Sequence, residues 1–487
     1  MSRLRQGVRA IGWSAAGELG SRVLGPLAFL VLARVLRPED FGIVASATVM
    51  ISLAQALADL GLGKALVQRE GNVEVAAATM LRLTAAIGAA LTAMLLLLAP
   101  VIAGFFGDAR VAPALRGLSP MLLLGALAAV PMALMQRELR FRELFWVRLA
   151  SGALPPLLSV PLALLLPAGQ GWWALVLGTL LGQAAQLVVA WMLLGEAQPR
   201  GGFDRDVARE LLAFGRWALL SSLFAWSYGW LDALVVGRAL GAHDMGLYRT
   251  GQTLVALVFG LVFAPLVPVL YSLFSRAQGE AALLHESLVT VINLAALVAL
   301  PLAVGMFLAG DLLARLLLGP QWQGAGLVIG VLALAQGAAW LVAFNGEVYR
   351  AIGRPAVEAA VMGPVLLLYA AGYVVAVEKG LESFVWARLA LTWLGIAVQV
   401  AATVWVLRLR ARDWATPLAS SVAFTGLALV LSGRTLALQL LAWALATTVA
   451  VMWQRKRLHA LVERWRIARQ PVAVAQTGST APRVEAG

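Results

Sequence analysis

The sequence of 487 residues contains no cysteine and little charge. Without cysteine, the chain has no disulfide, no thiolate metal site and no cysteine nucleophile. Its three histidines, His243, His285 and His459, are widely spaced in the sequence. A histidine metal cluster is therefore not expected. Only 13% of the residues are charged, whereas about 25% are charged in a soluble globular domain. We expect no metal and no cofactor.

Hydrophobic residues, in contrast, make up 61% of the chain, above the about 45–50% apolar content of soluble domains. They are gathered in uncharged runs, and a helix needs about 20 such residues to cross a bilayer. This composition predicts an all-α integral membrane protein. The net charge of +13 would favour a polyanion as partner. The basic residues lie between the apolar runs, however, so nucleic acid is not an expected partner.

Fourteen transmembrane helices are expected from the lengths of the apolar runs. The uncharged interval Leu149–Gly195 is too long for one helix, and the turn signal at 167–171 divides it into two. Two of the other expected spans carry charges in their interiors. The expected spans are 10–33, 41–58, 83–107, 117–136, 149–166, 172–195, 211–237, 250–275, 287–310, 316–346, 359–377, 389–407, 414–433 and 435–454.

The basic residues predict the orientation of these spans. With the N-terminus in the cytoplasm, 27 of the 38 Lys and Arg residues fall in cytoplasmic segments, 10 fall in outer loops and Arg22 lies within a span. Such a bias is what the positive-inside rule requires. We therefore expect both termini in the cytoplasm, with a basic tail on the inner leaflet.

An internal repeat relates the first and seventh expected spans. The segments 33–44 and 237–248 follow these spans at a constant offset of 204 residues. The identical positions are Arg34/Arg238, Leu36/Leu240, Asp40/Asp244 and Gly42/Gly246. Because six helices separate the copies, both enter the membrane in the same direction, as in parallel transporter repeats. We expect two six-helix bundles related by a parallel pseudo-twofold repeat, 1–197 and 198–410, then two helices, 411–454, and a tail, 455–487.

Four segments resemble a known family. They are Leu32–Ala45, Leu57–Arg69, Gln136–Arg142 and Tyr349–Pro355. The chain resembles the Wzx-type oligosaccharide flippases of the multidrug/oligosaccharidyl-lipid/polysaccharide exporter superfamily. The resemblance is specific over about the first 150 residues and looser afterwards. It implies flipping of lipid-pyrophosphate-linked oligosaccharide repeat units across the bacterial cytoplasmic (inner) membrane. Such units supply surface polysaccharide, namely O-antigen, capsule or exopolysaccharide.

The same resemblance implies the partners of the chain. These are the lipid-pyrophosphate-linked oligosaccharide and the membrane lipids around it. Polysaccharide polymerase machinery and a coupling ion, either a proton or sodium, are further candidates. No set of residues in the sequence identifies the ion.

Charges within the first expected span are candidates for binding the pyrophosphate, because an intramembrane charge is costly and usually faces a cavity. Glu18 and Arg22 are four residues apart and share one helix face. In one interpretation they are a self-satisfied pair that merely tolerates burial. In the other, Arg22 contacts the pyrophosphate and Glu18 tunes it.

Three charges of the second half are further candidates. Arg216 lies near the cytoplasmic start of the seventh span, as a substrate contact or an interfacial anchor. Asp232 lies near the outer end of that span and either pairs with Arg238 or Arg249 or takes up a coupling proton. Arg249 opens the eighth span and lines a cavity or anchors the interface.

Two other functions compete with flipping. A multidrug or small-molecule exporter of the same superfamily would need acidic cavity residues, whereas basic groups are prominent here. A membrane enzyme that polymerises or ligates lipid-linked glycans would need a sizeable external loop with catalytic side chains. The outer loops are short, so we do not expect an enzyme.

Overall fold

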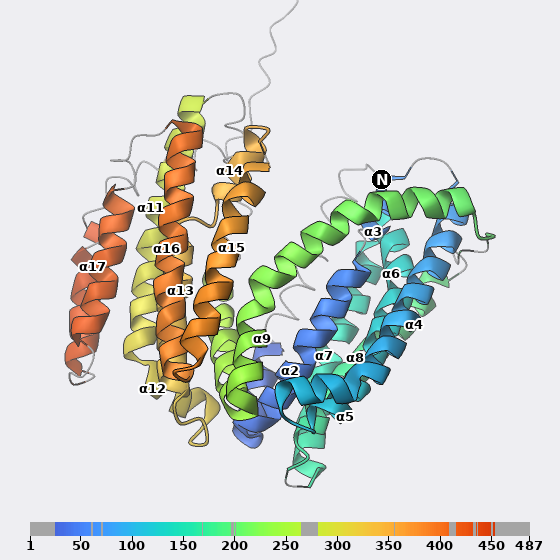
Figure 1. The fold of residues 1–487 in the computed structure, drawn as a ribbon, viewed down its shortest axis with the longest axis horizontal. Coiled ribbons are helices and arrows are strands. Elements are labelled where there is room, and N and C mark those ends of the chain that lie inside the picture. The colour runs from blue at the N-terminus through green and yellow to red at the C-terminus, as the bar shows by residue number, and fades with distance from the viewer. Residues whose placement is uncertain are drawn as a thin grey trace, which may run out of the picture.

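The computed structural model describes residues 25–59, 62–69, 72–167, 169–195, 199, 201–263, 281–354, 356–408, 415–431, 435, 437–449 and 451–452. Glu18, Arg22 and the tail 455–487 lie outside these residues. Throughout the described part, helices run between two opposite ends of the molecule (Figure 1).

The first half of the chain forms the group of helices on the right of Figure 1. Its helices are Gly25–Val35, α2 (Pro38–Ala58), α3 (Leu62–Gln68), α4 (Val73–Phe106), α5 (Val111–Leu118), α6 (Pro120–Arg137), α7 (Phe141–Leu165) and α8 (Trp172–Leu194). Local sequence explains where these begin and end. Pro38 opens α2, where the Asp40 side chain accepts a hydrogen bond from the Arg37 backbone N–H, 3.1 Å. The Asn72 side chain caps the start of α4, and Gly107, with φ 71°, follows its last residue, Phe106.

The second half forms the group on the left, and α9 crosses between the two groups (Figure 1). Its helices are α9 (Arg205–Phe263), α11 (Ala281–Leu308), α12 (Gly310–Leu313), η2 (Ala314–Leu318), α13 (Ala325–Ala339), α14 (Asn345–Ala351), α15 (Ala356–Val377), α16 (Leu381–Leu407), α17 (Ala415–Leu431) and Ala437–Val449. The long helix α9 turns sharply at Gly241, where φ is 82°. We call the residues of α9 before Gly241 its first arm and those after Gly241 its second arm. The first arm contains the seventh expected span, 211–237, and the second arm contains the start of the eighth, 250–263, whose remainder lies outside the described residues.

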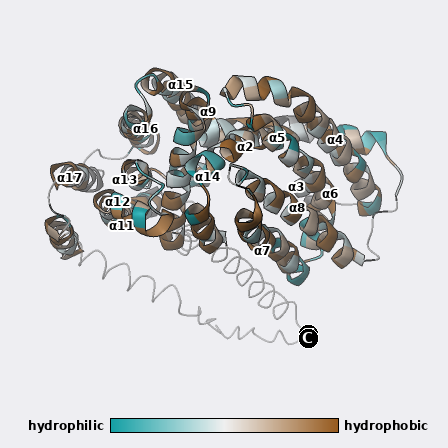
Figure 2. Ribbon diagram, turned by 90° about the horizontal axis from the view of Figure 1, so that it is seen from below, coloured by the Kyte–Doolittle hydropathy of each residue, from teal (hydrophilic) through white to brown (hydrophobic). Residues whose placement is uncertain are grey.

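Many helices of the described part suit a bilayer. Nine of them are long and apolar enough to cross a membrane. Large apolar side chains point outward, among them Leu165 and Met192, which are 81% and 74% exposed. Figure 2 shows hydrophobic colour on helices at the periphery, such as α7 and α17. The chain is therefore an all-α integral membrane protein, while the count of fourteen spans stays a prediction.

The expected span 316–346 is broken in the structure. The longest continuous helix within this span is α13, whose 15 residues lie between Gly324 and Trp340. Gly319 and Gly324 both have positive φ, 112° and 86°, a conformation that glycine adopts at little cost. These glycines turn the chain before α13, which hydropathy alone does not reveal.

The two repeat segments contact each other directly. A methyl group added at Gly42 would overlap the backbone carbonyl of Ala242, and one at Gly246 would overlap the carbonyl of Pro38. Ala242 is the repeat equivalent of Pro38, so the contact is reciprocal. Glycine at both positions lets two backbones touch, as small residues do between membrane helices.

Further contacts join the halves at the same end of the molecule. Glu39 Oε1 lies 2.7 Å from His243 Nδ1, and these residues are also repeat equivalents. The Trp322 indole N–H donates to the Ala33 carbonyl, 2.7 Å, and Arg34 donates to the carbonyls of Leu316 and Leu317. We call the region formed by residues 33–46, 237–248 and 316–322 the closed end.

Replacing Gly42 or Gly246 with alanine is expected to force the two backbones apart at the closed end. Overpacking of this kind costs about 1–3 kcal/mol, so the Tm of the purified protein should fall in both variants. Gly104→Ala on α4 is the matched control, because nothing lies within 4 Å of the added methyl group. Unchanged Tm values for Gly42→Ala and Gly246→Ala would contradict the close approach.

Candidate functional site

Four polar or aromatic side chains in the middle of α9 lie on two faces of this helix. Residues four apart share a helix face, so Tyr228 and Asp232 form one pair and Trp226 and Trp230 the other. The Trp226 indole N–H donates to Ser52 Oγ on α2, 2.9 Å. Asp232 contacts Arg388 on α16. This stretch of α9 is thus bonded to both halves of the molecule.

Asp232 is the centre of a hydrogen-bonded network. It is 4% exposed, and its carboxylate accepts a hydrogen bond from the Tyr248 hydroxyl, 2.6 Å. The guanidinium of Arg388 forms an ion pair with the same oxygen. The Gln252 amide donates to it as well, 3.4 Å. A buried charge needs such partners, because desolvation without them is expensive.

The position of Arg388 differs from the one expected from the sequence. The expected twelfth span began at Leu389 and placed Arg388 in an outer loop, but α16 begins at Leu381 and includes Arg388. Of the two alternatives for Asp232, pairing with Arg238 or Arg249 is not what the described residues show, because its ion pair is with Arg388; uptake of a coupling proton stays a prediction. Arg238 instead lies over the Phe105 ring, 5.3 Å from its centroid. The signal that could have found Arg388 was that a carboxylate within a span requires a basic group on another span.

Arg249 joins the network through Gln252. Its guanidinium donates to Gln252 Oε1, 2.6 Å, and Gln252 donates in turn to Asp232. The guanidinium also lies over the Trp230 ring, 4.1 Å from its centroid, in a cation–π contact. Two cations and one carboxylate therefore share this network, and its net charge is positive.

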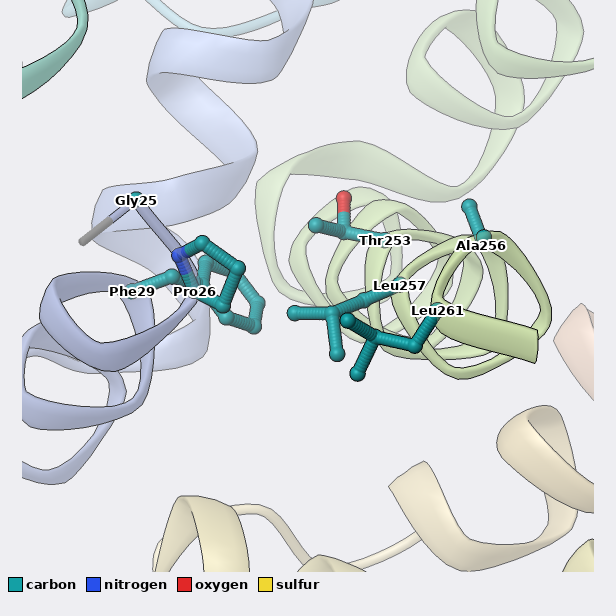
Figure 3. A pocket seen from close by; sticks show the side chains of 8 residues that line it. Gly25, Pro26, Phe29, Thr253, Ala256, Leu257 and Leu261 are labelled. Carbon is teal, nitrogen blue, oxygen red and sulfur yellow. The ribbon is translucent and has the colours of Figure 1, made fainter. Parts of the chain in front are cut away.

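An apolar pocket of about 480 Å³, which we call the apolar groove, begins one helical turn after Arg249. Thr253, four residues after Arg249, is on its wall and donates to the Arg249 carbonyl, 2.8 Å. In Figure 3, Pro26 and Phe29 from the first half face Leu257 and Leu261 from the second. Gly25, Ala256 and Gly260 complete the lining. The groove between the two halves thus begins one helical turn after Arg249 on the same helix, while the Arg249 guanidinium itself is held at Gln252 and Trp230.

The candidate residues of the sequence analysis divide into two groups. Asp232 and Arg249 are brought together in one network. Arg216 lies on α9, with its side chain outside the described part, and Glu18 and Arg22 lie outside it altogether. In the described ranges, no three His, Asp or Glu side chains group as a metal site.

Comparison with known proteins identifies the family. Residues 31–326 match the family described as polysaccharide biosynthesis protein. The chain belongs to this family. The match covers the helices from the first half to the start of α13, and so includes the closed end, Asp232 and Arg249.

Curated relatives of the chain have low sequence identity to it, but the similarity extends over most of each sequence. It is 24% identical over 369 residues to the teichuronic acid biosynthesis protein TuaB of Bacillus subtilis, covering 76% of each chain. It is 27% identical over 334 residues to the succinoglycan biosynthesis transport protein ExoT of Rhizobium meliloti, covering 68% of this chain and 66% of ExoT. The lipopolysaccharide biosynthesis protein WzxC of Escherichia coli is 24% identical over 329 residues, which are 66% of this chain and 65% of WzxC.

Solved structures show the same fold at low sequence identity. The inward closed conformation of the lipid II flippase MurJ matches with a TM-score of 0.73 and 14% identity, over 91% of this chain and 99% of MurJ. An inward-facing multidrug resistance transporter of the MATE family matches with a TM-score of 0.60 and 17% identity, over 80% and 95%. The all-α transporter fold expected from the sequence is confirmed.

Replacing Arg388 with methionine is expected to leave Asp232 buried with its charge no longer compensated by a cation. Breaking a buried ion pair in this way costs about 3–5 kcal/mol, so the Tm should fall strongly. The double variant Asp232→Asn with Arg388→Met should recover much of the loss, because no net charge is left behind. Arg209→Met, which breaks an exposed pair with Asp206 on the same helix α9, should change the Tm little. Additive losses in the double variant would contradict the coupling.

Proposed function

We propose that the protein flips lipid-pyrophosphate-linked oligosaccharide repeat units across the membrane by alternating access. Relatives named for teichuronic acid, lipopolysaccharide and succinoglycan support a role in surface polysaccharide synthesis. Structures named as a flippase and a multidrug transporter share the fold. The chain is accordingly a transport protein and not an enzyme.

The observation that carries this proposal is that Arg249 lies one helical turn before the apolar groove on α9. A lipid-linked sugar has an anionic pyrophosphate between an apolar tail and a polar oligosaccharide. The guanidinium of Arg249 offers charge-assisted hydrogen bonds to phosphate oxygens. The groove of Pro26, Phe29, Leu257 and Leu261 offers apolar surface to the tail. Together they match the junction of head and tail.

The Asp232–Arg388 pair supports the same assignment. Arg388 neutralises the one carboxylate of the network, so Asp232 does not cancel the charge of Arg249. Gln252 holds the Arg249 guanidinium from one edge and Trp230 supports its face. The cation is thus positioned before the substrate arrives, which lowers the entropic cost of binding.

The closed end supplies the barrier of the proposed cycle. If both termini are cytoplasmic, as the basic residues predict, the closed end faces outward across the inner membrane. The pyrophosphate would then enter from the cytoplasm, and opening would separate Glu39 from His243 and Gly42 from Ala242. A proton or sodium gradient and a polymerase that receives the flipped unit complete the proposed system.

Replacing Arg249 with alanine is expected to slow flipping of lipid-linked oligosaccharide in proteoliposomes by about tenfold to a hundredfold, the value of a charge-assisted hydrogen bond. Arg22→Ala is expected to abolish surface polysaccharide while the protein stays in the membrane. Arg209→Ala is the control, because this exposed arginine lies on the same helix α9 and does not line the groove.

The location of the accumulated substrate distinguishes flipping from other activities. In a deletion strain, lipid-linked repeat units should accumulate on the cytoplasmic leaflet. Accumulation on the outer leaflet, or full flipping by Arg249→Ala, would contradict the proposal.

A further inference from the structure

A second pocket lies within the helices of the second half. Its volume is about 230 Å³, and it lies between α9, α13, α14, α15 and α16. Unlike the apolar groove, it is lined by many polar groups. They include Tyr228, Asn345, Glu358, Tyr369 and Gln399.

Asn345 is the feature of this pocket that requires an explanation. Its side chain is 3% exposed. In the described part of the chain, neither the amide nitrogen nor the amide oxygen has a hydrogen-bond partner. Leaving a buried polar group unsatisfied is costly, and native proteins rarely keep one without a reason. An amide that lines a pocket in this state is suited to a ligand with its own donors and acceptors.

The rest of the lining indicates a neutral, hydroxylated ligand. The carboxylate of Glu358 already forms an ion pair with Arg350, 3.0 Å, so it does not call for a free cation. Gln399 contributes a second buried amide. An amide carries an acceptor and two donors side by side, which match neighbouring hydroxyl groups on a sugar ring.

The tyrosines add aromatic surface to this set. The rings of Tyr228 and Tyr369 lie 5.9 Å apart between centroids. Gly395 makes room for the Tyr369 hydroxyl, because a methyl group at that position would overlap it. Aromatic faces with a polar tip suit ligands that are part apolar and part hydroxylated. The volume lies below the about 300–1,000 Å³ of pockets for drug-sized ligands, which suits a single sugar ring.

We infer that this pocket binds one monosaccharide unit of the translocated oligosaccharide and contributes to the choice of sugar. The inference rests on the proposed flippase function. Tyr228 links the two sites, because it lies four residues before Asp232 on α9, about 6 Å along the helix. Asp232 is in turn joined to Arg249 through Gln252, so α9 and this network connect the pocket with the residue proposed to hold the pyrophosphate.

The test measures binding to the full-length protein in lipid nanodiscs with three probes. The first is the lipid-linked oligosaccharide extracted from a strain deleted for this gene. The second is polyprenyl pyrophosphate without sugar, and the third is the oligosaccharide released from the first probe by mild acid. The variant Asn345→Leu removes the amide at similar size. Gln336→Leu is the matched control, since Gln336 is an amide of α13 that does not line the pocket.

We expect wild type and Gln336→Leu to bind the first probe more tightly than the second. Asn345→Leu should bind the first probe about tenfold more weakly, the effect of one or two lost hydrogen bonds, and the second unchanged. The third probe should compete for the first in wild type and not in Asn345→Leu. Equal binding of the first probe by wild type and Asn345→Leu would overturn the pocket assignment.

Two further results separate the remaining explanations. If wild type binds neither the first probe nor the second, the proposed function itself fails. If Asn345→Leu loses the second probe as well, the variant is misfolded, and Gln399→Met then decides. That variant removes the other buried amide of the lining with little change in size. Unchanged binding of the first probe by Gln399→Met would overturn the inference.

Discussion

The close approach of two backbones, Gly42 to Ala242 and Gly246 to Pro38, is the constraint on which the arrangement of the two halves depends. It brings the start of α2 against the second arm of α9, with the repeat equivalents Pro38 and Ala242 opposite each other. The helix Gly25–Val35, which directly precedes α2, then lies beside residues 253–261. The apolar groove between the halves is therefore a consequence of how the repeat segments meet. A side chain at either glycine would open this contact and change the groove.

The second constraint is that charge within an apolar protein must be compensated. Asp232 is buried, and Arg388 reaches it from α16 across the second half. The pair fixes the first arm of α9, while Gln252 extends the network to Arg249 on the second arm. One surplus cation thus remains in the network, one helical turn from an apolar groove. That combination is rare in a membrane interior because of its cost, and it suits a lipid with an anionic head.

Sequence reasoning predicted what depends on composition and spacing. Apolar runs gave the class of protein, and the offset of 204 residues identified segments that do contact each other in space. The rarity of charge within spans also pointed to Asp232 and Arg249 as candidate site residues. Sequence reasoning missed Arg388, because hydropathy places a charge at the end of a run in a loop, whereas an ion pair lets the helix continue past it. It missed the breaks at Gly319 and Gly324 for a similar reason, since hydropathy does not report φ. Asn345 lies in the expected span 316–346, and only the fold shows that it lines a pocket.

The central claim is that the closed end seals one side of the membrane and must open for transport. Because the chain contains no cysteine, Glu39→Cys and His243→Cys introduce two thiols without background. A short thiol-specific crosslinker should join them in high yield in the resting protein and stop flipping of lipid-linked oligosaccharide. A cleavable reagent should restore flipping after reduction, and each single variant should flip normally in its presence. Full flipping by the crosslinked protein, or no crosslinking in protein that is active, would contradict the account.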